Sequence, residues 1–203
     1  MLSASVSDID LYRTWRNSED LDVNWLLRRL RKEEPPTPAM EAGTAFHQIL
    51  EKPDFEEQTE LFTVLNGQEY WFSIVCDIEI TLPRIRELRV EKQYGDLLVR
   101  GRVDGLEALT VTDYKTTGQF DPDRLMEGYQ WRFYLDTLKC DTFIWKVFVI
   151  DQFGKPGHYD VKQFHGLKQH RYAGMGEDCQ RLAAEYLQFT QEIGFVKEKE
   201  VAA

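Results

Sequence analysis

The sequence predicts an α/β protein with a central mixed β-sheet flanked by helices. Three observations support this fold class. Apolar residues recur at helical spacing in some segments, β-rich runs form others, and helices precede, interrupt and follow the strands. Because the 203 residues are 42% hydrophobic and contain no repeat or linker-like stretch, we expect a single domain spanning residues 1–203.

The N-terminal segment is predicted to contain two helices, over residues 7–16 and 19–32. Glu33-Glu34-Pro35-Pro36 ends the second helix, because proline lacks a backbone N–H and restricts the residue before it. A third helix is expected after Thr37-Pro38, with the threonine as N-cap. Its apolar stripe consists of Ala42, Ala45, Phe46, Ile49 and Leu50, with His47 beside it.

Five strands are predicted in the middle of the chain. They span residues 61–65, 70–75, 88–94, 97–105 and 110–116. Asn66-Gly67 joins the first two as a hairpin, because this dipeptide favours the positive φ angles of a two-residue turn. Gly95-Asp96 joins the next two. The middle of the chain therefore supplies most of the sheet.

The C-terminal part is predicted to alternate between helix and strand. Its elements are a helix over residues 121–138, a strand over 143–150, a returning segment over 158–164 and a helix over 168–193. Asp121-Pro122 provides an N-cap and first turn for the first of these helices. Residues 195–203 are expected to form a flexible tail.

Charge and composition restrict the functional classes. The net charge is −10 with a pI of about 5.0, the wrong sign for holding nucleic acid by phosphate neutralisation alone. A DNA contact would need a local basic groove, bound metal, or both. The three cysteines are far apart, odd in number and outside any CxxC pair, which argues against a zinc ribbon or a disulfide framework. No signal-like start or membrane-length apolar run occurs, so we expect no membrane association and a cytoplasmic location.

Two carboxylates and one lysine are predicted to converge on neighbouring strands. Asp113 and Lys115 are two residues apart on a strand, so their side chains share a face. Asp104 ends the preceding strand, and the short connection over residues 106–109 places it alongside Asp113. Phosphodiester hydrolysis needs hard oxygen ligands for Mg²⁺ and a cation near the developing charge. An ordinary surface ion pair is the alternative reading of the Asp-x-Lys spacing alone.

Five segments in order resemble the PD-(D/E)XK nuclease superfamily, and within it the RecB-like group that includes exonucleases of the RecE and lambda-exonuclease kind. Gly43–His47 is similar to the helical GxxxH motif, and Glu91 stands where the group often has an acid. Gly101–Gly105 resembles the G-x-x-D motif, Asp113–Thr116 the D-x-K motif, and Gln130–Tyr134 the QxxxY motif. Together these core motifs cover residues 43–134, preceded by the helical segment 1–36.

The resemblance implies a restriction-endonuclease-like core and a Mg²⁺ or Mn²⁺ site. It implies that Asp104, Asp113, the backbone carbonyl of Tyr114 and His47 bind the metal. Lys115 would orient or activate water. Glu91 is implied as a further catalytic acid, and Gln130 and Tyr134 as residues that steady the substrate or the lysine. The group's iron–sulfur cluster is not expected, because its four-cysteine arrangement is missing.

Several residues keep a purely structural alternative. His47 could be a hydrogen-bonded structural histidine, Tyr134 could pack in the core, and Glu91 could form a surface ion pair. Arg100 and Arg102 share the face of Asp104 and could line a phosphate groove or pair with acids. Thr116 and Thr117 are predicted to contact DNA together with these arginines.

The leading hypothesis is therefore a divalent-metal-dependent deoxyribonuclease, an exonuclease of DNA recombination, repair or phage DNA metabolism. DNA is the expected partner, with a recombination or single-strand-annealing protein and a second copy of the chain as further candidates. One alternative is a catalytically silent nuclease-fold module that binds nucleic acid or protein. Another is an acidic DNA mimic, whose acids should spread over exposed faces.

Overall fold

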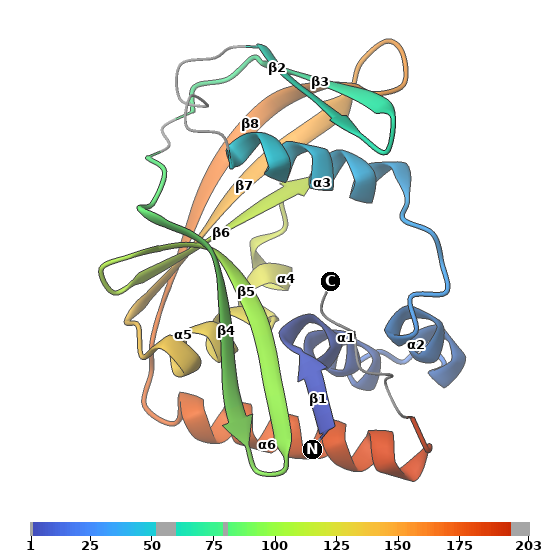
Figure 1. The fold of residues 1–203 in the computed structure, drawn as a ribbon, viewed down its shortest axis with the longest axis vertical. Coiled ribbons are helices and arrows are strands. Elements are labelled where there is room, and N and C mark those ends of the chain that lie inside the picture. The colour runs from blue at the N-terminus through green and yellow to red at the C-terminus, as the bar shows by residue number, and fades with distance from the viewer. Residues whose placement is uncertain (1, 52–59, 79–80, 196–203) are drawn as a thin grey trace.

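A computed structural model describes residues 2–51, 60–78 and 81–195 of the chain. These residues form one mixed sheet with the strand order β1-β5-β6-β7-β8-β3-β2, and β4 pairs with β5 beside this path. Helix α3 lies across one end of the sheet, whereas α1, α5 and α6 gather at the other end (Figure 1). The predicted α/β class with a mixed sheet, flanking helices and a C-terminal helix is confirmed.

The chain begins with a strand that the sequence did not predict. β1 (Leu2–Ser5) pairs in parallel with β5 (Leu97–Glu107). Ser5 then caps α1 (Val6–Arg16), and it forms a capping box with Asp8. The second predicted helix is confirmed as α2 (Val23–Leu30), which starts later than expected because Asp22 is its N-cap.

The third helix and the first hairpin agree with the prediction. α3 (Pro38–Leu50) begins after the N-cap Thr37, whose side chain accepts a hydrogen bond from the Met40 N–H. β2 (Glu60–Leu65) and β3 (Gln68–Ile74) pair antiparallel. Asn66 and Gly67 have φ angles of 52° and 81°, as a tight hairpin turn requires.

Three antiparallel strands follow, and they carry most of the predicted motifs. They are β4 (Ile85–Tyr94), β5 and β6 (Thr110–Thr117). The turn at Gly95 and Asp96 sets the register of β4 on β5, so that Tyr94 lies opposite Leu97. β6 also pairs in parallel with β7 (Thr142–Gln152), which places β6 inside the sheet.

The prediction of one continuous helix over residues 121–138 is wrong. The chain forms α4 (Pro122–Glu127) and α5 (Gln130–Leu138), separated at Gly128, whose φ and ψ are −54° and 153°. The carboxylate of Asp10 on α1 accepts a hydrogen bond from the Tyr129 N–H at 2.7 Å. This distant acceptor replaces the helical partner of that N–H, so the break is stabilised by tertiary structure.

The predicted start of the final helix at residue 168 is also wrong. β8 (His158–His170) pairs with β7 as far as Thr142 opposite His170, so residues 168–170 belong to the sheet. α6 (Met175–Glu192) begins only after Gly174, which has a φ of 90°. The expected flexible tail lies outside the described residues, except for residue 195.

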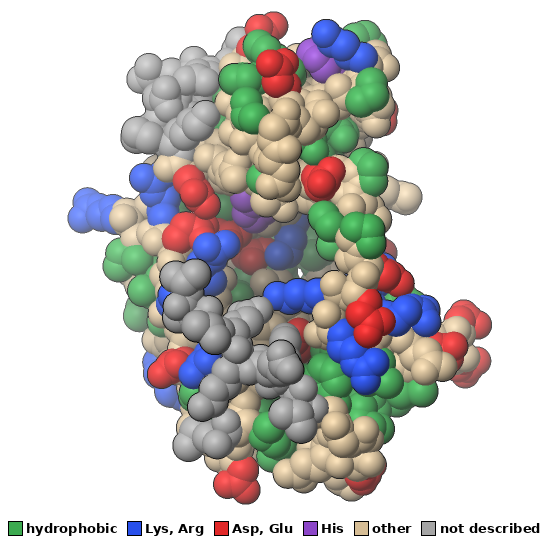
Figure 2. Space-filling model, turned by 45° about the vertical axis from the view of Figure 1, so that its right-hand side comes forward, with side chains coloured by type: hydrophobic (Ala, Val, Ile, Leu, Met, Phe, Trp, Pro, Cys, Tyr) green, Lys and Arg blue, Asp and Glu red, His purple; other side chains and the backbone are tan. Residues whose placement is uncertain are grey.

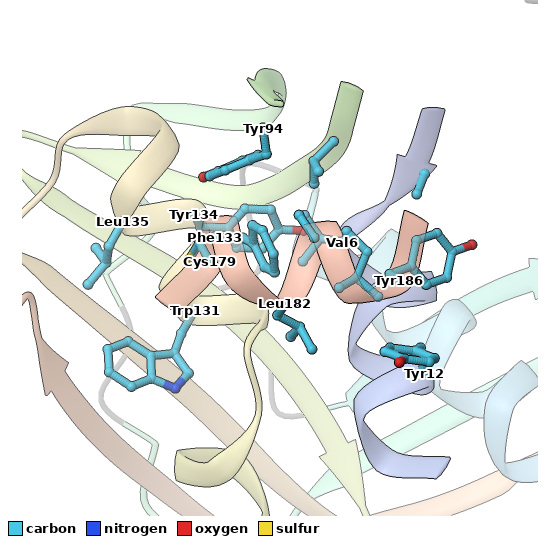
Figure 3. Packing of buried hydrophobic residues seen from close by; sticks show 14 of the residues in the cluster. Val6, Tyr12, Tyr94, Trp131, Phe133, Tyr134, Leu135, Cys179, Leu182 and Tyr186 are labelled. Atoms are coloured by element: carbon cyan, nitrogen blue, oxygen red, sulfur yellow. The ribbon is translucent and has the colours of Figure 1, made fainter. Parts of the chain in front are cut away.

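Buried apolar side chains form two clusters, one at each end of the sheet. The larger cluster, the α5–α6 core, joins α1, α5, α6 and β4, and it includes Tyr12, Tyr94, Trp131, Tyr134 and Tyr186 (Figure 3). The smaller cluster, the α3 core, lies under α3 and includes Phe46, Phe72 and Phe148. Strand β6 contributes Val111 to the first cluster and Tyr114 to the second. The end of β6 therefore lies at the seam between the two cores.

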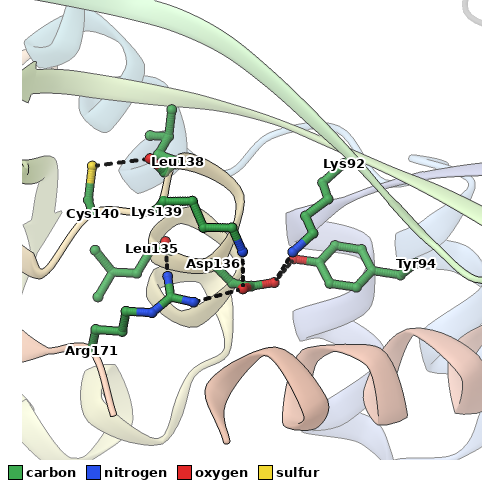
Figure 4. Close-up of polar contacts among 8 residues, drawn as sticks. All are labelled: Lys92, Tyr94, Leu135, Asp136, Leu138, Lys139, Cys140 and Arg171. Atoms are coloured by element: carbon green, nitrogen blue, oxygen red, sulfur yellow. Dashed lines mark hydrogen bonds and ion pairs between the residues drawn. The ribbon is translucent and has the colours of Figure 1, made fainter. Parts of the chain in front are cut away.

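One buried carboxylate ties the α5–α6 core together. Asp136 is 1% exposed, and its Oδ2 accepts hydrogen bonds from Lys92 Nζ at 2.6 Å and Tyr94 OH at 2.7 Å. Its Oδ1 accepts from Lys139 Nζ and from an Arg171 guanidinium nitrogen, both at 3.1 Å (Figure 4). A single side chain of α5 thus connects β4, the end of α5 and the segment that leads into α6.

Cys76, Cys140 and Cys179 are free thiols. In the part of the chain that the structure describes, every helix is too short or too polar to cross a membrane.

Candidate active site

The hairpin of β5 and β6 brings Asp104 and Asp113 together, as the sequence predicted. Gly105 pairs with Thr112, so Asp104 and Asp113 occupy the next opposed positions. The Tyr114 N–H donates a hydrogen bond to Asp104 Oδ2 at 2.7 Å. The two acids therefore lie beside each other where the two strands diverge.

Asp113 is held by one cation and one amide. Asp113 is 2% exposed, and Lys115 Nζ lies 2.7 Å from its Oδ2. Gln130 Nε2, at the start of α5, donates to Asp113 Oδ1 at 3.3 Å. The buried Oδ2 has the Lys115 contact but no hydrogen bond of regular geometry within the described residues. The predicted Asp113, Lys115 and Gln130 are thus brought together.

His47 approaches this pair from α3. A Cβ at Gly43 would meet Thr116 Oγ1 at 2.8 Å, so the glycine lets α3 pack closely on the end of β6. One turn later, His47 Nδ1 lies 3.8 Å from Asp104 Oδ2. Burial lowers the pKa of His47, and nearby Asp113 only partly opposes this effect. The imidazole is therefore neutral near pH 7 and available as a ligand or hydrogen-bonding group.

The two acids and the lysine perturb each other. Burial, followed by the charge of Asp113, raises the pKa of Asp104 to about 7. Burial alone would lower the pKa of Lys115, but the charge of Asp113 in close contact outweighs it and raises that pKa. Lys115 is therefore a firmly protonated ammonium. The site combines one carboxyl that titrates near neutrality with one fixed cation.

Tyr134 is buried, but it also contacts the strand that carries Asp104. Its hydroxyl donates to the backbone oxygen of Arg102 at 2.9 Å. A Cβ at Gly101 would lie 2.5 Å from the Tyr134 ring, so this glycine provides room for the tyrosine. Tyr134 thus packs in the α5–α6 core. Its hydroxyl holds the backbone of β5 in place.

Glu91 is not brought to the site. It is an exposed residue of β4, and its carboxylate lies 3.4 Å from Arg100, as in the surface ion-pair alternative. The acid nearest Asp104 on β4 is Glu87, because the register that pairs Tyr94 with Leu97 places Glu87 opposite Asp104. Burial raises the pKa of Glu87, whose carboxylate lies 2.8 Å from Arg102.

Glu87 was missed because the predicted strand began at residue 88. One sequence signal could have found it. The two-residue turn at Gly95-Asp96 fixes the register of the flanking strands. Counting back from that turn pairs residue 87 with residue 104, whereas residue 91 falls opposite Arg100.

Two cavities meet at the end of β6. One, of about 270 Å³, is lined by Lys115, Phe120, Arg124 and Gln130, and the other, of about 420 Å³, reaches the start of α3. Thr116 and Thr117 line both. A hollow in the face shown in Figure 2 has both basic and acidic side chains within it and along its rim. Arg100 and Arg102, in contrast, are engaged by Glu91 and Glu87.

The oxygen and nitrogen donors at this site are of the kinds that bind a small divalent cation. The described side chains do not gather three His, Cys, Asp or Glu groups into a ready-made metal cage. Mg²⁺ does not require one, since it commonly keeps several waters and uses one or two carboxylates. Asp113 supplies a buried oxygen without a regular hydrogen bond, and Asp104 is adjacent. The residues that could hold the ion are Asp104, Asp113, the Tyr114 carbonyl and His47.

Comparison with known proteins gives similarity at the level of the fold. No protein-family model matches the chain, and no curated protein matches it. A provisionally assigned exonuclease of Eubacterium rectale has 9% sequence identity and a TM-score of 0.51, over 98% of this chain and 85% of that one. An alkaline exonuclease of Laribacter hongkongensis has 12% identity and a TM-score of 0.47, over 94% and 89% of the two chains. The same alkaline exonuclease in complex with dAMP has 13% identity and a TM-score of 0.42, over 94% and 93%.

Proposed function

We propose that the chain is a divalent-metal-dependent deoxyribonuclease, an exonuclease of the RecB-like group of the PD-(D/E)XK superfamily. One observation carries this proposal. Asp104 and Asp113 converge at the divergence of β5 and β6, and Lys115 lies 2.7 Å from Asp113. A protein that only binds DNA or a partner has no need to bury such a mutually repelling acid pair. The fold shared with the Eubacterium rectale protein supports the exonuclease assignment.

The residues of the site would divide the chemistry between them. Asp104, Asp113, the Tyr114 carbonyl and His47 would hold Mg²⁺ or Mn²⁺, which polarises the phosphate and lowers the pKa of bound water. Lys115 carries a raised pKa, so its ammonium donates hydrogen bonds and stabilises developing negative charge rather than abstracting a proton. Gln130 fixes the orientation of Asp113 through its amide.

Protonation of Asp104 would control the site. With a pKa of about 7, the carboxyl is largely neutral in mildly acidic solution and must lose its proton to bind a cation. Cation binding should therefore release a proton, and cleavage at limiting metal should rise as the pH increases through 7.

The wider setting is part of the same proposal. The substrate is DNA, cleaved in recombination, repair or phage DNA metabolism in the cytoplasm. A single-strand-annealing or other recombination protein is the proposed partner, and a homo-oligomer is the proposed assembly. No iron–sulfur cluster is involved, because Cys76, Cys140 and Cys179 do not provide its four ligands.

The test is cleavage of end-labelled linear DNA beside covalently closed circles, with and without Mg²⁺. We expect metal-dependent loss of the linear DNA and survival of the circles. Asp113→Ala should be inactive, whereas Asp20→Ala, which removes an exposed acid between α1 and α2, should match the wild type. Equal cleavage of both substrates would replace the exonuclease with an endonuclease. No cleavage of either substrate at any divalent-metal concentration would support the silent binding module.

A further inference from the structure

A stacked pair of rings lies next to the proposed site and has no part in the chemistry described above. Phe120 follows β6, five residues after Lys115, and His165 lies on β8. The ring centroids are 4.1 Å apart and the ring planes differ by only 5°. Both residues remain partly exposed. A half-exposed, coplanar pair differs from the buried aromatic contacts that fill the two cores.

The segment that carries Phe120 is held at both ends. Thr117 Oγ1 donates to the Gln119 backbone oxygen at 2.7 Å and accepts from the Gln119 N–H at 3.2 Å. On the other side, Asp121 caps α4 by accepting from the Arg124 N–H at 3.1 Å. The Phe120 ring is therefore positioned in advance, which reduces the ordering cost of binding a ligand against it.

Phe120 also lines the cavity of about 270 Å³ that contains Lys115. Two cations, Lys115 and Arg124, and two acids, Asp10 and Asp121, contribute to its walls. The acids are engaged, since Asp10 contacts Arg13 and the Tyr129 N–H. Among the described residues, the Arg124 guanidinium forms no ion pair or hydrogen bond. The cavity therefore offers an aromatic ring and a free cation next to the proposed catalytic lysine.

We infer that Phe120, backed by His165, stacks on one unpaired base of the strand being cut. The inference rests on the proposed nuclease function and specifies the form of its substrate. Base–aromatic stacking with a nearby cation is the usual way in which proteins hold single strands without reading their sequence. The cavity is lined by residues of α1, β6, β7, α4 and the start of α5. Its volume suits one nucleotide, so the enzyme takes a strand that is unpaired at the point of cleavage.

A structural role for Phe120 makes a different prediction. The ring also contacts the margin of the α5–α6 core, so its removal could simply loosen the fold. Phe120→Leu keeps an apolar side chain but removes the aromatic face, and Phe120→Trp keeps an aromatic face. If packing alone matters, leucine should be tolerated. If stacking matters, tryptophan should be tolerated and leucine should not.

The test uses single-stranded DNA with 2-aminopurine at the terminal or second nucleotide, bound in EDTA so that no cleavage occurs. We expect the wild type and Phe120→Trp to quench the fluorophore at one of these positions. Phe120→Leu should lose the quenching and bind about tenfold more weakly, within the range for one base–aromatic contact. Phe62→Leu is the matched control, because Phe62 is an exposed aromatic whose ring contacts Trp71 at a tilt of 43° in the β2–β3 hairpin.

The outcomes separate this inference from the proposed function. Folded Phe120→Leu that quenches and binds like the wild type would overturn the stacking role, and so would wild-type protein that binds DNA without quenching. Absence of Mg²⁺-dependent cleavage would overturn the nuclease function but leave the quenching measurement intact. A folded wild-type protein that does not bind single-stranded DNA at all would also overturn the inference.

Discussion

Two buried carboxyl groups lie near opposite ends of α5, and their surroundings differ. Asp136, near the C-terminal end, accepts hydrogen bonds from four donors, three of them cationic. Asp113, beside the N-terminal Gln130, has one cation, one weak amide contact and a second acid as neighbour. The donors around Asp136 stabilise its negative charge. The environment of Asp113 leaves capacity to bind something positive.

The pKa values show the same contrast. Burial alone would raise the pKa of Asp136, but hydrogen bonds from Lys92, Tyr94 and Lys139 outweigh it and hold this pKa well below its usual range. In the Asp104–Asp113 pair, burial and mutual repulsion together raise the pKa of Asp104 to about 7. A carboxylate whose charge the surrounding donors stabilise is thus distinguished from a carboxyl group whose charge its surroundings disfavour. The following predictions test this distinction.

The largest effect is expected for Asp113→Ala. Loss of a proposed metal ligand should reduce Mg²⁺-dependent cleavage by at least about 10³-fold. The free energy of unfolding without metal should stay within about 1 kcal/mol of the wild type, because relief of the repulsion on Asp104 offsets the loss of the Lys115 contact. Cleavage rates and urea unfolding curves of the same preparation measure both effects. A variant that is inactive because it is unfolded would weaken the distinction.

Lys115→Ala should have the next largest effect on activity. It keeps both acids, so metal binding should persist while the cleavage rate falls about 10²–10³-fold, the usual cost of one preorganised charge-stabilising group. Single-turnover rates at saturating Mn²⁺ are the appropriate measurement. Full rescue by additional Mn²⁺ would show that Lys115 acts on metal affinity instead.

Asp136→Ala should lower the free energy of unfolding and leave the cleavage activity of the folded protein unchanged. Removing the common acceptor breaks a buried ion-pair network, which costs about 3–5 kcal/mol of unfolding free energy. The specific activity of the molecules that remain folded should stay near that of the wild type. Urea unfolding with cleavage measured well below the midpoint tests both statements. Lys139→Ala is a mild control, because this lysine is 64% exposed and should contribute about 1 kcal/mol or less.

The pH dependence of stability should show opposite signs at the two sites. The raised pKa of Asp104 means that the folded protein holds this proton more tightly than the unfolded chain, so its stabilising contribution is lost as the pH rises from about 4 to about 7. The lowered pKa of Asp136 provides stability above about pH 4 that is lost as the pH falls further.

Metal-free unfolding free energies of the wild type, Asp104→Asn and Asp136→Asn across pH 3–8 would show these trends. The difference between the wild type and Asp104→Asn should decrease with pH, and the difference for Asp136→Asn should increase from the acidic end. The same slope for both variants would contradict the contrast between the two sites.

Local sequence patterns were sufficient for the hairpins and for the central part of the site. The spacing of Asp113 and Lys115 and the short connection back to Asp104 depend only on strand geometry and a tight turn. Thr37, Pro38 and Asn66-Gly67 are likewise local signals, and each is found where it was expected. Such features are predictable because residues close in sequence determine them.

The missed features depend on contacts between distant residues. β1 is four residues long and becomes a strand by pairing with β5, almost a hundred residues away. The helix break at Gly128 is stabilised by Asp10, and the Asp136 network combines residues from β4, α5 and Arg171. Glu87 lies between these cases, because the predicted strand began three residues too late and left it out.

The most direct test of the site is calorimetric titration with Mn²⁺ of the wild type, Asp113→Ala and Lys115→Ala, each verified as folded. We expect the wild type and Lys115→Ala to bind the ion and Asp113→Ala to lose that binding, with a proton released on binding near pH 7. Equal Mn²⁺ binding by the wild type and Asp113→Ala, or no binding by folded wild-type protein, would contradict the assignment of these carboxylates as a metal site.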